Sequence, residues 1–309
     1  MTAEDSKWRV LSNLETESPN PYTVDIDSLD TIEILTKINE EDRKVPFAVA
    51  KAIPEIAKVV ELCVAALQSG GRVIYVGAGT SGRIGFLDAT EVVPTFGVPE
   101  GIFIAVIAGG REALVRSVEF VEDNADLGAQ DLANLNICKK DVVIGITASG
   151  RTPYVRGALL YARSVGATTA LICNVSSPEL EKYAHVTIKA VTGAEVITGS
   201  TRMKAGSAQK MILNMISTAT MIKLGKVYKN YMVDVMVLNE KLEQRALRII
   251  MDVTGVSEDI AFQYLRKADD RPKLAILMIL SNKPKEVCAK ALEKTDSLRE
   301  ALRILEKAD

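Results

Sequence analysis

The chain has 309 residues, of which 48% are hydrophobic and 25% are charged, so it can bury a large core and is not intrinsically disordered. Its 38 basic and 40 acidic residues leave a formal charge of −2, which argues against a nucleic acid partner. Residues 1–20 do not have the pattern of a secretory signal, and the apolar run 274–280 is much shorter than a membrane-spanning helix. We therefore expect a cytoplasmic protein with no membrane partner.

The cysteines and the histidine argue against the usual zinc and histidine-based sites. None of the four cysteines (63, 138, 173 and 288) forms a C-x-x-C pair, and we interpret them as small apolar residues in a reducing compartment. The one histidine, His185, precedes a short strand-like run and is interpreted as a strand-end residue. We therefore expect no metal site.

The first 70 residues predict helices that precede a sheet. Residues 1–45 are polar and predict an extended arm followed by a helix near 28–38. Residues 46–69 carry apolar side chains at helical spacing, which predicts an amphipathic helix.

Five short apolar runs then predict an α/β fold. They cover residues 73–76, 102–108, 142–146, 169–173 and 186–188. Each run is apolar throughout, which is typical of parallel strands that are buried on both faces. Parallel neighbours need crossover helices, and residues 111–121 and 153–165 are predicted to supply two of them. The class is therefore a five-stranded parallel sheet between helices.

The C-terminal third is predicted to be helical. The expected helices cover residues 201–224, 233–252, 258–267, 271–280, 285–294 and 297–307. We predict three regions: an N-terminal arm and first helix (1–45), a sheet domain (46–235) and a small C-terminal helical region (236–309).

The loop after the first strand contains G-x-G-x-x-G, the fingerprint of a dinucleotide site, at residues 77–82. Such a site expects an acidic residue where the second strand ends. Here that strand ends in Ile107-Ala108-Gly109-Gly110, and Glu100 lies at the wrong end of the strand. The dinucleotide interpretation is therefore disfavoured.

A loop sequence that recurs along the chain favours a phosphate ligand instead of a dinucleotide. Ser-Gly-Arg follows the first strand at 81–83 and the third strand at 149–151, and Gly-Ser-Thr-Arg occurs at 199–202. Hydroxyls, a glycine and free N–H groups at a helix start form an anion site. One such loop would indicate only helix capping. Several at the carboxyl edge of one parallel sheet indicate a phosphate ligand.

Without a histidine nearby, acid–base chemistry in this chain needs carboxylates. The candidates near the loops are Glu91, Glu119, Glu122, Asp123 and Glu195.

Several long motifs resemble the N-acetylmuramic acid 6-phosphate etherase family. The matching segments are residues 76–83, 87–91, 94–97, 107–110, 148–155, 195–206, 208–210, 225–228, 230 and 232–234, and the resemblance extends from Thr16-Glu17 to the C-terminal helices. Pro19 and Ser207 depart from the family pattern, which usually has Arg and Thr there.

The resemblance implies a sugar isomerase (SIS) domain with a flavodoxin-like sheet, a homodimer and no cofactor. It implies cleavage of the D-lactyl ether of N-acetylmuramic acid 6-phosphate, giving N-acetylglucosamine 6-phosphate and D-lactate, in the recycling of cell-wall sugar. The sugar opens to its aldehyde, a base removes the proton on carbon 2, an acid protonates the departing ether oxygen, and water adds.

The resemblance also implies residue roles. Glu91 matches the proton donor to lactate, and Glu122 matches the second acid/base, which we assign to carbon 2. Phosphate is expected on Ser149 and Thr152, with Arg151 on either the phosphate or the lactyl carboxylate. The remaining expected substrate contacts are Gly79, Thr80, Ser81, Gly150, Glu195, Ser200 and Thr201.

Two other functions share these loops. A non-catalytic phosphosugar-binding regulator of the glucokinase-regulatory type would bind the sugar without releasing lactate. A sugar-phosphate isomerase would convert aldose to ketose, again without lactate. Because a single SIS domain here carries both Glu91 and Glu122, the sequence favours the enzyme.

Overall fold

The computed structural model describes residues 15–235, 237 and 239–307. It divides into two compact units. The first comprises Met1–Thr90 and Gly101–Ser217, and the second comprises Glu91–Glu100 and Thr218–Asp309. The sheet lies in the first unit and the C-terminal helices lie in the second.

The first unit is built on five parallel strands in the order β2-β1-β3-β4-β5. The strands are β1 (Val73–Gly77), β2 (Phe103–Ile107), β3 (Val142–Ile146), β4 (Thr168–Cys173) and β5 (Val186–Lys189). Every residue of β1 and β3 is buried, as expected for central strands covered on both faces. The predicted α/β class and its five strands are confirmed, and the strand order is that of flavodoxin-like folds.

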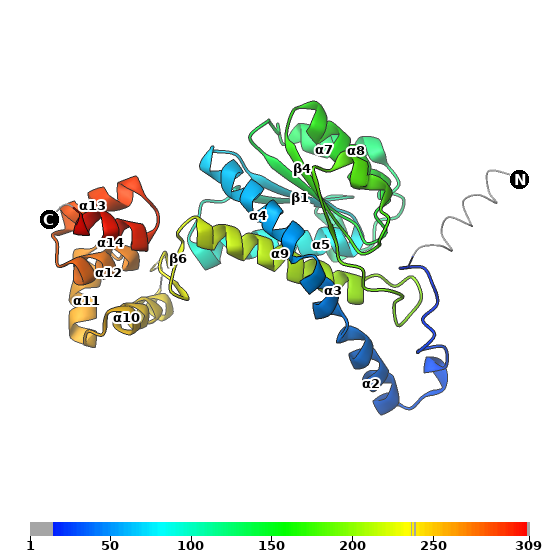
Figure 1. Ribbon diagram of the computed structural model, residues 1–309, viewed down its shortest axis with the longest axis horizontal. Helices are drawn as coiled ribbons and strands as arrows, with labels where there is room; N and C mark the ends of the chain where they lie inside the picture. The colour runs from blue at the N-terminus through cyan, green and yellow to red at the C-terminus, as the bar shows by residue number, and fades with distance from the viewer. Residues whose placement is uncertain (1–14, 236, 238, 308–309) are drawn as a thin grey trace, which may run out of the picture. The chain divides into compact units, whose positions relative to one another are not determined.

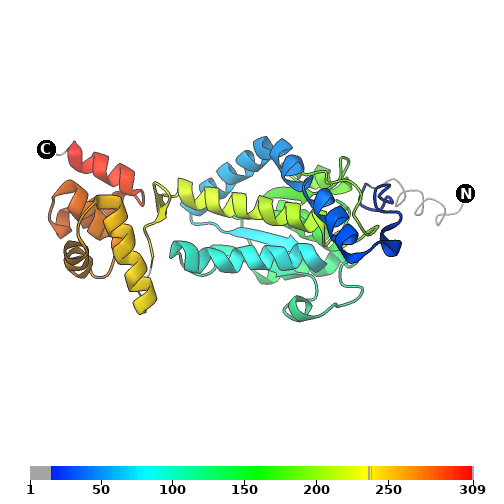
Figure 2. The ribbon, with the colours of Figure 1, turned by 90° about the horizontal axis from the view of Figure 1, so that it is seen from below.

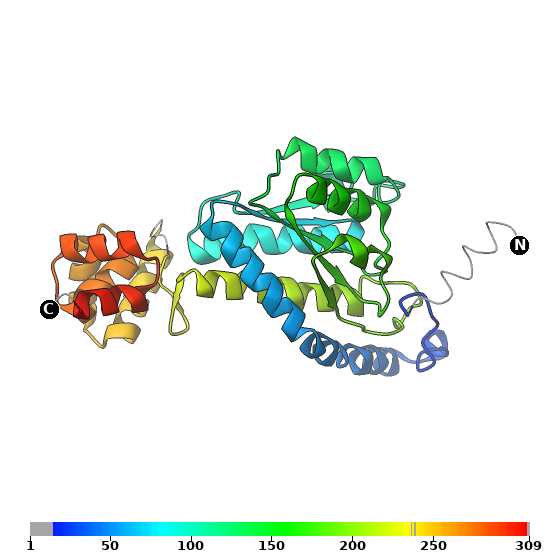
Figure 3. The ribbon, with the colours of Figure 1, turned by 45° about the horizontal axis from the view of Figure 1, so that its top comes forward.

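Helices cover both faces of the sheet (Figure 3). On one face lie α7 (Ala125–Asn134) and α8 (Pro153–Ser164), and on the other lie α4 (Ile53–Gln68), α5 (Gly79–Phe96) and α9 (Lys204–Lys223). A Cβ on Gly157 of α8 would lie 1.8 Å from the carbonyl oxygen of Ala125, so glycine there allows α7 and α8 to pack closely.

A buried carboxylate joins α5 to α9, which lie side by side (Figure 2). Asp88 of α5 accepts hydrogen bonds from the Tyr75 hydroxyl (3.0 Å), the Asn214 amide (2.7 Å) and the Ser217 hydroxyl (3.1 Å). Burial raises the pKa of Asp88, and the three donors oppose that rise.

Two of the helices predicted for the first unit differ from the structure. The helix expected over 46–69 is two helices, α3 (Val45–Lys51) and α4, because Pro54 in the first turn of α4 has no N–H to continue the ladder. The helix expected over 111–121 is only the single turn α6 (Glu112–Val115). It ends because Arg116 is extended and Phe120 has a φ of +63°, so α7 is the main helix of this crossover.

Besides the ends of α5 and α9, the described residues of the second unit form five helices (Figure 1): α10 (Glu240–Thr254), α11 (Glu258–Lys267), α12 (Pro272–Ser281), α13 (Lys285–Lys294) and α14 (Leu298–Glu306). They share one apolar core, in which most of α12 is buried. The helix expected over 233–252 begins later, at the cap Asn239, because a hairpin of β6 (Val227–Tyr228) and β7 (Tyr231–Met232) comes first. In the first unit, the helix expected near 28–38 is α2 (Thr31–Asp42).

Candidate functional site

The main cavity lies where the strand order reverses. β1 and β3 are neighbours, but the chain leaves β1 toward β2 on one side and β3 toward β4 on the other. Ligands of open α/β sheets bind at the carboxyl ends of such strands. A cavity of about 500 Å³ is found there, lined by the loops that follow β1 and β3.

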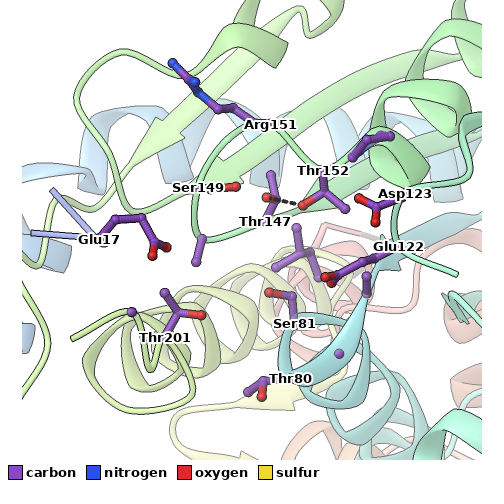
Figure 4. A pocket seen from close by; sticks show the side chains of 16 residues that line it. Glu17, Thr80, Ser81, Glu122, Asp123, Thr147, Ser149, Arg151, Thr152 and Thr201 are labelled. Carbon is purple, nitrogen blue, oxygen red and sulfur yellow. Dashed lines mark hydrogen bonds between the residues drawn. The ribbon is translucent and has the colours of Figure 1, made fainter. Parts of the chain in front are cut away.

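Hydroxyl groups line the floor of this cavity. Thr80 and Ser81 come from the first turn of α5, and Ser149 and Thr152 come from the loop that leads into α8 (Figure 4). The Thr147 and Thr152 hydroxyls lie 2.8 Å apart and share a hydrogen bond. Both α5 and α8 begin at this cavity, and the positive end of each helix dipole favours an anion there.

Gly150 gives the second loop its shape without lining the cavity. Its φ is +68°, and a Cβ there would lie 2.4 Å from the Cβ of Pro178. Both the left-handed backbone and the contact with Pro178 therefore require glycine.

Carboxylates occupy the walls. Glu122 and Asp123 lie on one side of the cavity, and Glu17 points into it from the other (Figure 4). The backbone of Glu122 is held by α8, because the Tyr154 N–H donates to the Glu122 carbonyl at 3.0 Å. The cavity thus combines an anion-binding floor with acidic groups able to transfer protons.

Arg151 turns its guanidinium away from the cavity floor (Figure 4). Its Nη2 lies 3.5 Å from Oε1 of Glu179, in the short helix η2 (Glu179–Tyr183). Its Nε is buried and has no hydrogen-bond partner within the described part of the chain. In this conformation Arg151 lines the cavity with its stem.

Glu195 caps a helix instead of lining the cavity. Its side chain is fully buried, and its two oxygens accept from the N–H groups of Lys204 and Ala205, each at 2.9 Å. Burial raises the pKa of Glu195, while the two amides oppose that effect. The geometry therefore gives Glu195 a structural task at the start of α9.

Two more of the expected site residues lie outside the cavity lining. Glu91 is exposed on α5, twelve residues after Gly79. It does not line the cavity. Ser200 also lies outside the lining, whereas its neighbour Thr201 contributes to it.

The structure adds residues to the set expected from sequence. Glu17, Thr147 and Gly199 line the cavity, and Asp123, weighed earlier as a candidate, joins them. Glu17 falls within the Thr16-Glu17 start of the family resemblance, which was the available signal. Its place is fixed by tertiary bonds, because Glu15 accepts from the Ser176 amide at 3.1 Å and Asn20 donates to the Ala194 carbonyl at 3.2 Å.

Among the described residues, neither a metal site nor a membrane-spanning helix is found. No group of three or more His, Cys, Asp or Glu side chains there could hold a metal ion. Nor is any described helix both long enough and apolar enough to span a bilayer.

Family models match three stretches of the chain. The SIS domain model matches residues 116–219. The N-terminal SIS domain of glucokinase regulatory protein matches residues 55–163, and the C-terminal lid domain of that protein matches residues 229–273.

Curated relatives match nearly the full length. The N-acetylmuramic acid 6-phosphate etherase of Petrotoga mobilis is 56% identical over 96% of this chain and 99% of its own length. The protein of that name from Pseudothermotoga lettingae is 58% identical over 95% of this chain and 98% of its own length. This chain belongs to the N-acetylmuramic acid 6-phosphate etherase family.

Solved structures are similar at lower identity. A phosphoheptose isomerase from Francisella tularensis is 15% identical, with a TM-score of 0.45 over 62% of this chain and 98% of that one. The Vibrio vulnificus NanR protein complexed with ManNAc-6P is 13% identical, with a TM-score of 0.45 over 65% of this chain and 67% of that one. Membership of the etherase family, at 48–58% identity among the relatives, disfavours the regulator and isomerase alternatives.

Proposed function

We propose that the cavity at the ends of β1 and β3 is the active site of this etherase. The chain is a carbon–oxygen lyase that converts N-acetylmuramic acid 6-phosphate to N-acetylglucosamine 6-phosphate and D-lactate. The observation that carries the assignment of the site is the meeting of two hydroxyl-bearing loops with Glu122 in one cavity.

The phosphate binds to the floor of the cavity in this proposal. Ser149 and Thr152 donate hydroxyl hydrogen bonds, and Thr80 and Ser81 add two more from α5. The two helix N-termini support this placement, because each favours an anion by about 0.3–1 kcal/mol. The acidic walls favour the neutral part of the sugar, since carboxylates repel phosphate.

Glu122 acts at carbon 2. Once the sugar is open, the aldehyde makes the carbon 2 proton acidic, and the Glu122 carboxylate removes it. The carbon 3–oxygen bond then breaks as the departing lactate oxygen receives a proton. Water adds across the double bond, with hydroxyl to carbon 3 and a proton back to carbon 2. A general acid or base of this kind is worth about 10²–10⁴-fold in rate.

Glu91 donates the proton to lactate from a second copy of the chain. Within one copy it is exposed and does not line the cavity. The α5 surface beside it is partly apolar, since Leu87, one turn earlier, is 52% exposed. A homodimer that packs this face against its partner would bury Leu87 and complete the partner's site.

Region boundaries and location follow the sequence interpretation. The N-terminal arm and first helix take residues 1–45, the SIS domain 46–235 and the helical region 236–309. The proposed location is the cytoplasm, which agrees with the interpretation of the cysteines as small apolar residues in a reducing compartment.

Lactate release from N-acetylmuramic acid 6-phosphate tests this site. The wild-type protein should release D-lactate from the phosphorylated sugar and not from the unphosphorylated one. Glu122→Gln should lower the rate at least about 100-fold while still binding N-acetylglucosamine 6-phosphate. Near-normal turnover by Glu122→Gln would place the site elsewhere.

A further inference from the structure

A smaller second cavity adjoins the first. It has a volume of about 110 Å³ and lies between the start of α5 and residues 117–122 of the crossover segment. It shares Ala78, Gly79 and Glu122 with the main cavity. A group attached to the sugar beside Glu122 can therefore enter it.

Part of its wall is apolar, and a larger part is polar. Ala108, Ala113, Val118 and Val121 line it. The space is small, at about 110 Å³. A small methyl-sized group suits this space better than a long or branched one.

The polar side chains supply a donor and acceptors. Nη2 of Arg83 donates one hydrogen bond to the Arg116 carbonyl at 3.1 Å. The guanidinium has five N–H groups in all, so others can donate to a ligand. Glu119 and Glu122 also line the cavity. The cavity thus has two carboxylates and one guanidinium, and this net negative charge disfavours an anionic group of the ligand. It suits a neutral group that both accepts and donates hydrogen bonds.

The segment that carries these side chains is held in a costly backbone conformation. Phe120, which lines the cavity, has a φ of +63° and is 84% exposed. A bulky residue in the left-handed region is uncommon, and such strain is concentrated at ligand-binding sites.

We infer that this second cavity binds the N-acetyl group of the substrate. The inference rests on the proposed role of Glu122 at carbon 2, because carbon 2 is the atom that bears the acetamido group. Arg83 donates to the acetyl oxygen, the methyl group packs against Ala113 and Val118, and the amide N–H faces a carboxylate. The cavity thus selects 2-acetamido sugars.

The lactyl group is the other substituent close to Glu122. It carries a carboxylate, which Glu119 and Glu122 would repel, so the observed charges favour the acetamido group. An experiment can distinguish an acetamido group from a lactyl group in this cavity. The product N-acetylglucosamine 6-phosphate keeps the acetyl group and lacks the lactyl group.

The test compares binding of N-acetylglucosamine 6-phosphate and glucose 6-phosphate by calorimetry. The two ligands differ only at carbon 2. The wild-type protein should bind the acetylated sugar at least about tenfold more tightly, from one buried methyl group and one hydrogen bond. Val118→Phe, which fills the cavity, should abolish that preference while leaving glucose 6-phosphate binding unchanged.

Val115→Phe is the matched control, since Val115 is 86% exposed in the same segment and does not line the cavity. It should keep the wild-type preference. Arg83→Lys is a second variant that leaves the cavity open, and it should weaken only the acetylated sugar.

Two results would overturn the inference. One is an unchanged preference in folded Val118→Phe. The other is a Val118→Phe protein that binds the product normally but has a raised KM for N-acetylmuramic acid 6-phosphate, which would assign the cavity to lactate. Either can occur with normal wild-type lactate release, so failure here is distinct from failure of the proposed active site.

Discussion

The ammonium nitrogen of Lys204 lies 2.6 Å from Oε2 of Glu41, and both side chains are almost completely buried. Glu41 lies in the last turn of α2 and Lys204 begins α9, so the pair fixes α2 to the start of a helix 163 positions later. Burial alone would raise the pKa of Glu41, but hydrogen bonds from Lys204 and Lys44 bring it below its ordinary value.

Breaking this pair should strongly destabilise the fold. Glu41→Gln leaves a buried ammonium without its counter-charge, which costs about 3–5 kcal/mol of unfolding free energy. Urea unfolding measures it. Lys58→Gln is the control, because its 3.8 Å pair with Glu55 is exposed and its loss should cost under about 0.5 kcal/mol. Equal effects of the two variants would contradict this account.

Acid should weaken the fold through Asp141. The Arg72 guanidinium donates to both of its oxygens, at 3.2 and 2.7 Å, and backbone amides add to these bonds. Burial would raise the pKa of Asp141, yet these donors hold it below the ordinary 3.8. A lowered carboxyl pKa stabilises the folded state above the ordinary value, and this contribution is lost as pH falls through the folded pKa.

The measurement is urea unfolding from pH 7 to pH 3. Asp141→Asn should be less stable than wild type at pH 7, and the gap should narrow toward pH 3. A gap that stays constant over this range would show that ionisation of Asp141 is not the cause.

Removal of one floor hydroxyl should weaken phosphate binding. Ser149→Ala loses a hydrogen bond to a charged group, worth about 1.5–3 kcal/mol, so Kd for N-acetylglucosamine 6-phosphate should rise about 10- to 100-fold. Ser164→Ala, at the exposed far end of α8, makes the same chemical change and should bind normally. A Ser149→Ala protein with wild-type affinity would remove Ser149 from the phosphate site.

A shared active site should allow complementation. Glu91→Gln and Glu122→Gln are each expected to be nearly inactive alone. If they are mixed after reversible dissociation, random pairing makes half of the dimers mixed, each with one intact site, so activity should reach about one quarter of wild type. A mixture that stays inactive despite proven subunit exchange would place both glutamates in the same copy's site.

The strands were the most predictable part of the fold. Residues 142–146 were predicted and found without change, because burial on both faces leaves an uninterrupted apolar run. The recurring loops likewise marked the edge where the cavity lies. Local signals sufficed in both cases.

What the sequence left open depends on long-range contacts. Glu17 and Glu195 are both acidic residues within the family resemblance, yet Glu17 points into the cavity while Glu195 is buried against the start of α9. Only the folded chain separates them. The break between α3 and α4 had a local signal in Pro54, which the helical periodicity on either side obscured.

The hydrogen bond from the Tyr154 N–H to the carbonyl of Glu122 connects the start of α8 to the proposed catalytic segment. Thr152, the cap residue of α8, belongs to the phosphate floor in our proposal. Tyr154, two residues later, holds the backbone of Glu122, whose carboxylate is the proposed base at carbon 2. Recognition and chemistry thus share one rigid support. A sugar without its phosphate should bind more weakly, and its carbon 2 should be less well aligned with the base. We therefore expect such a sugar to have a lower kcat as well as a higher KM.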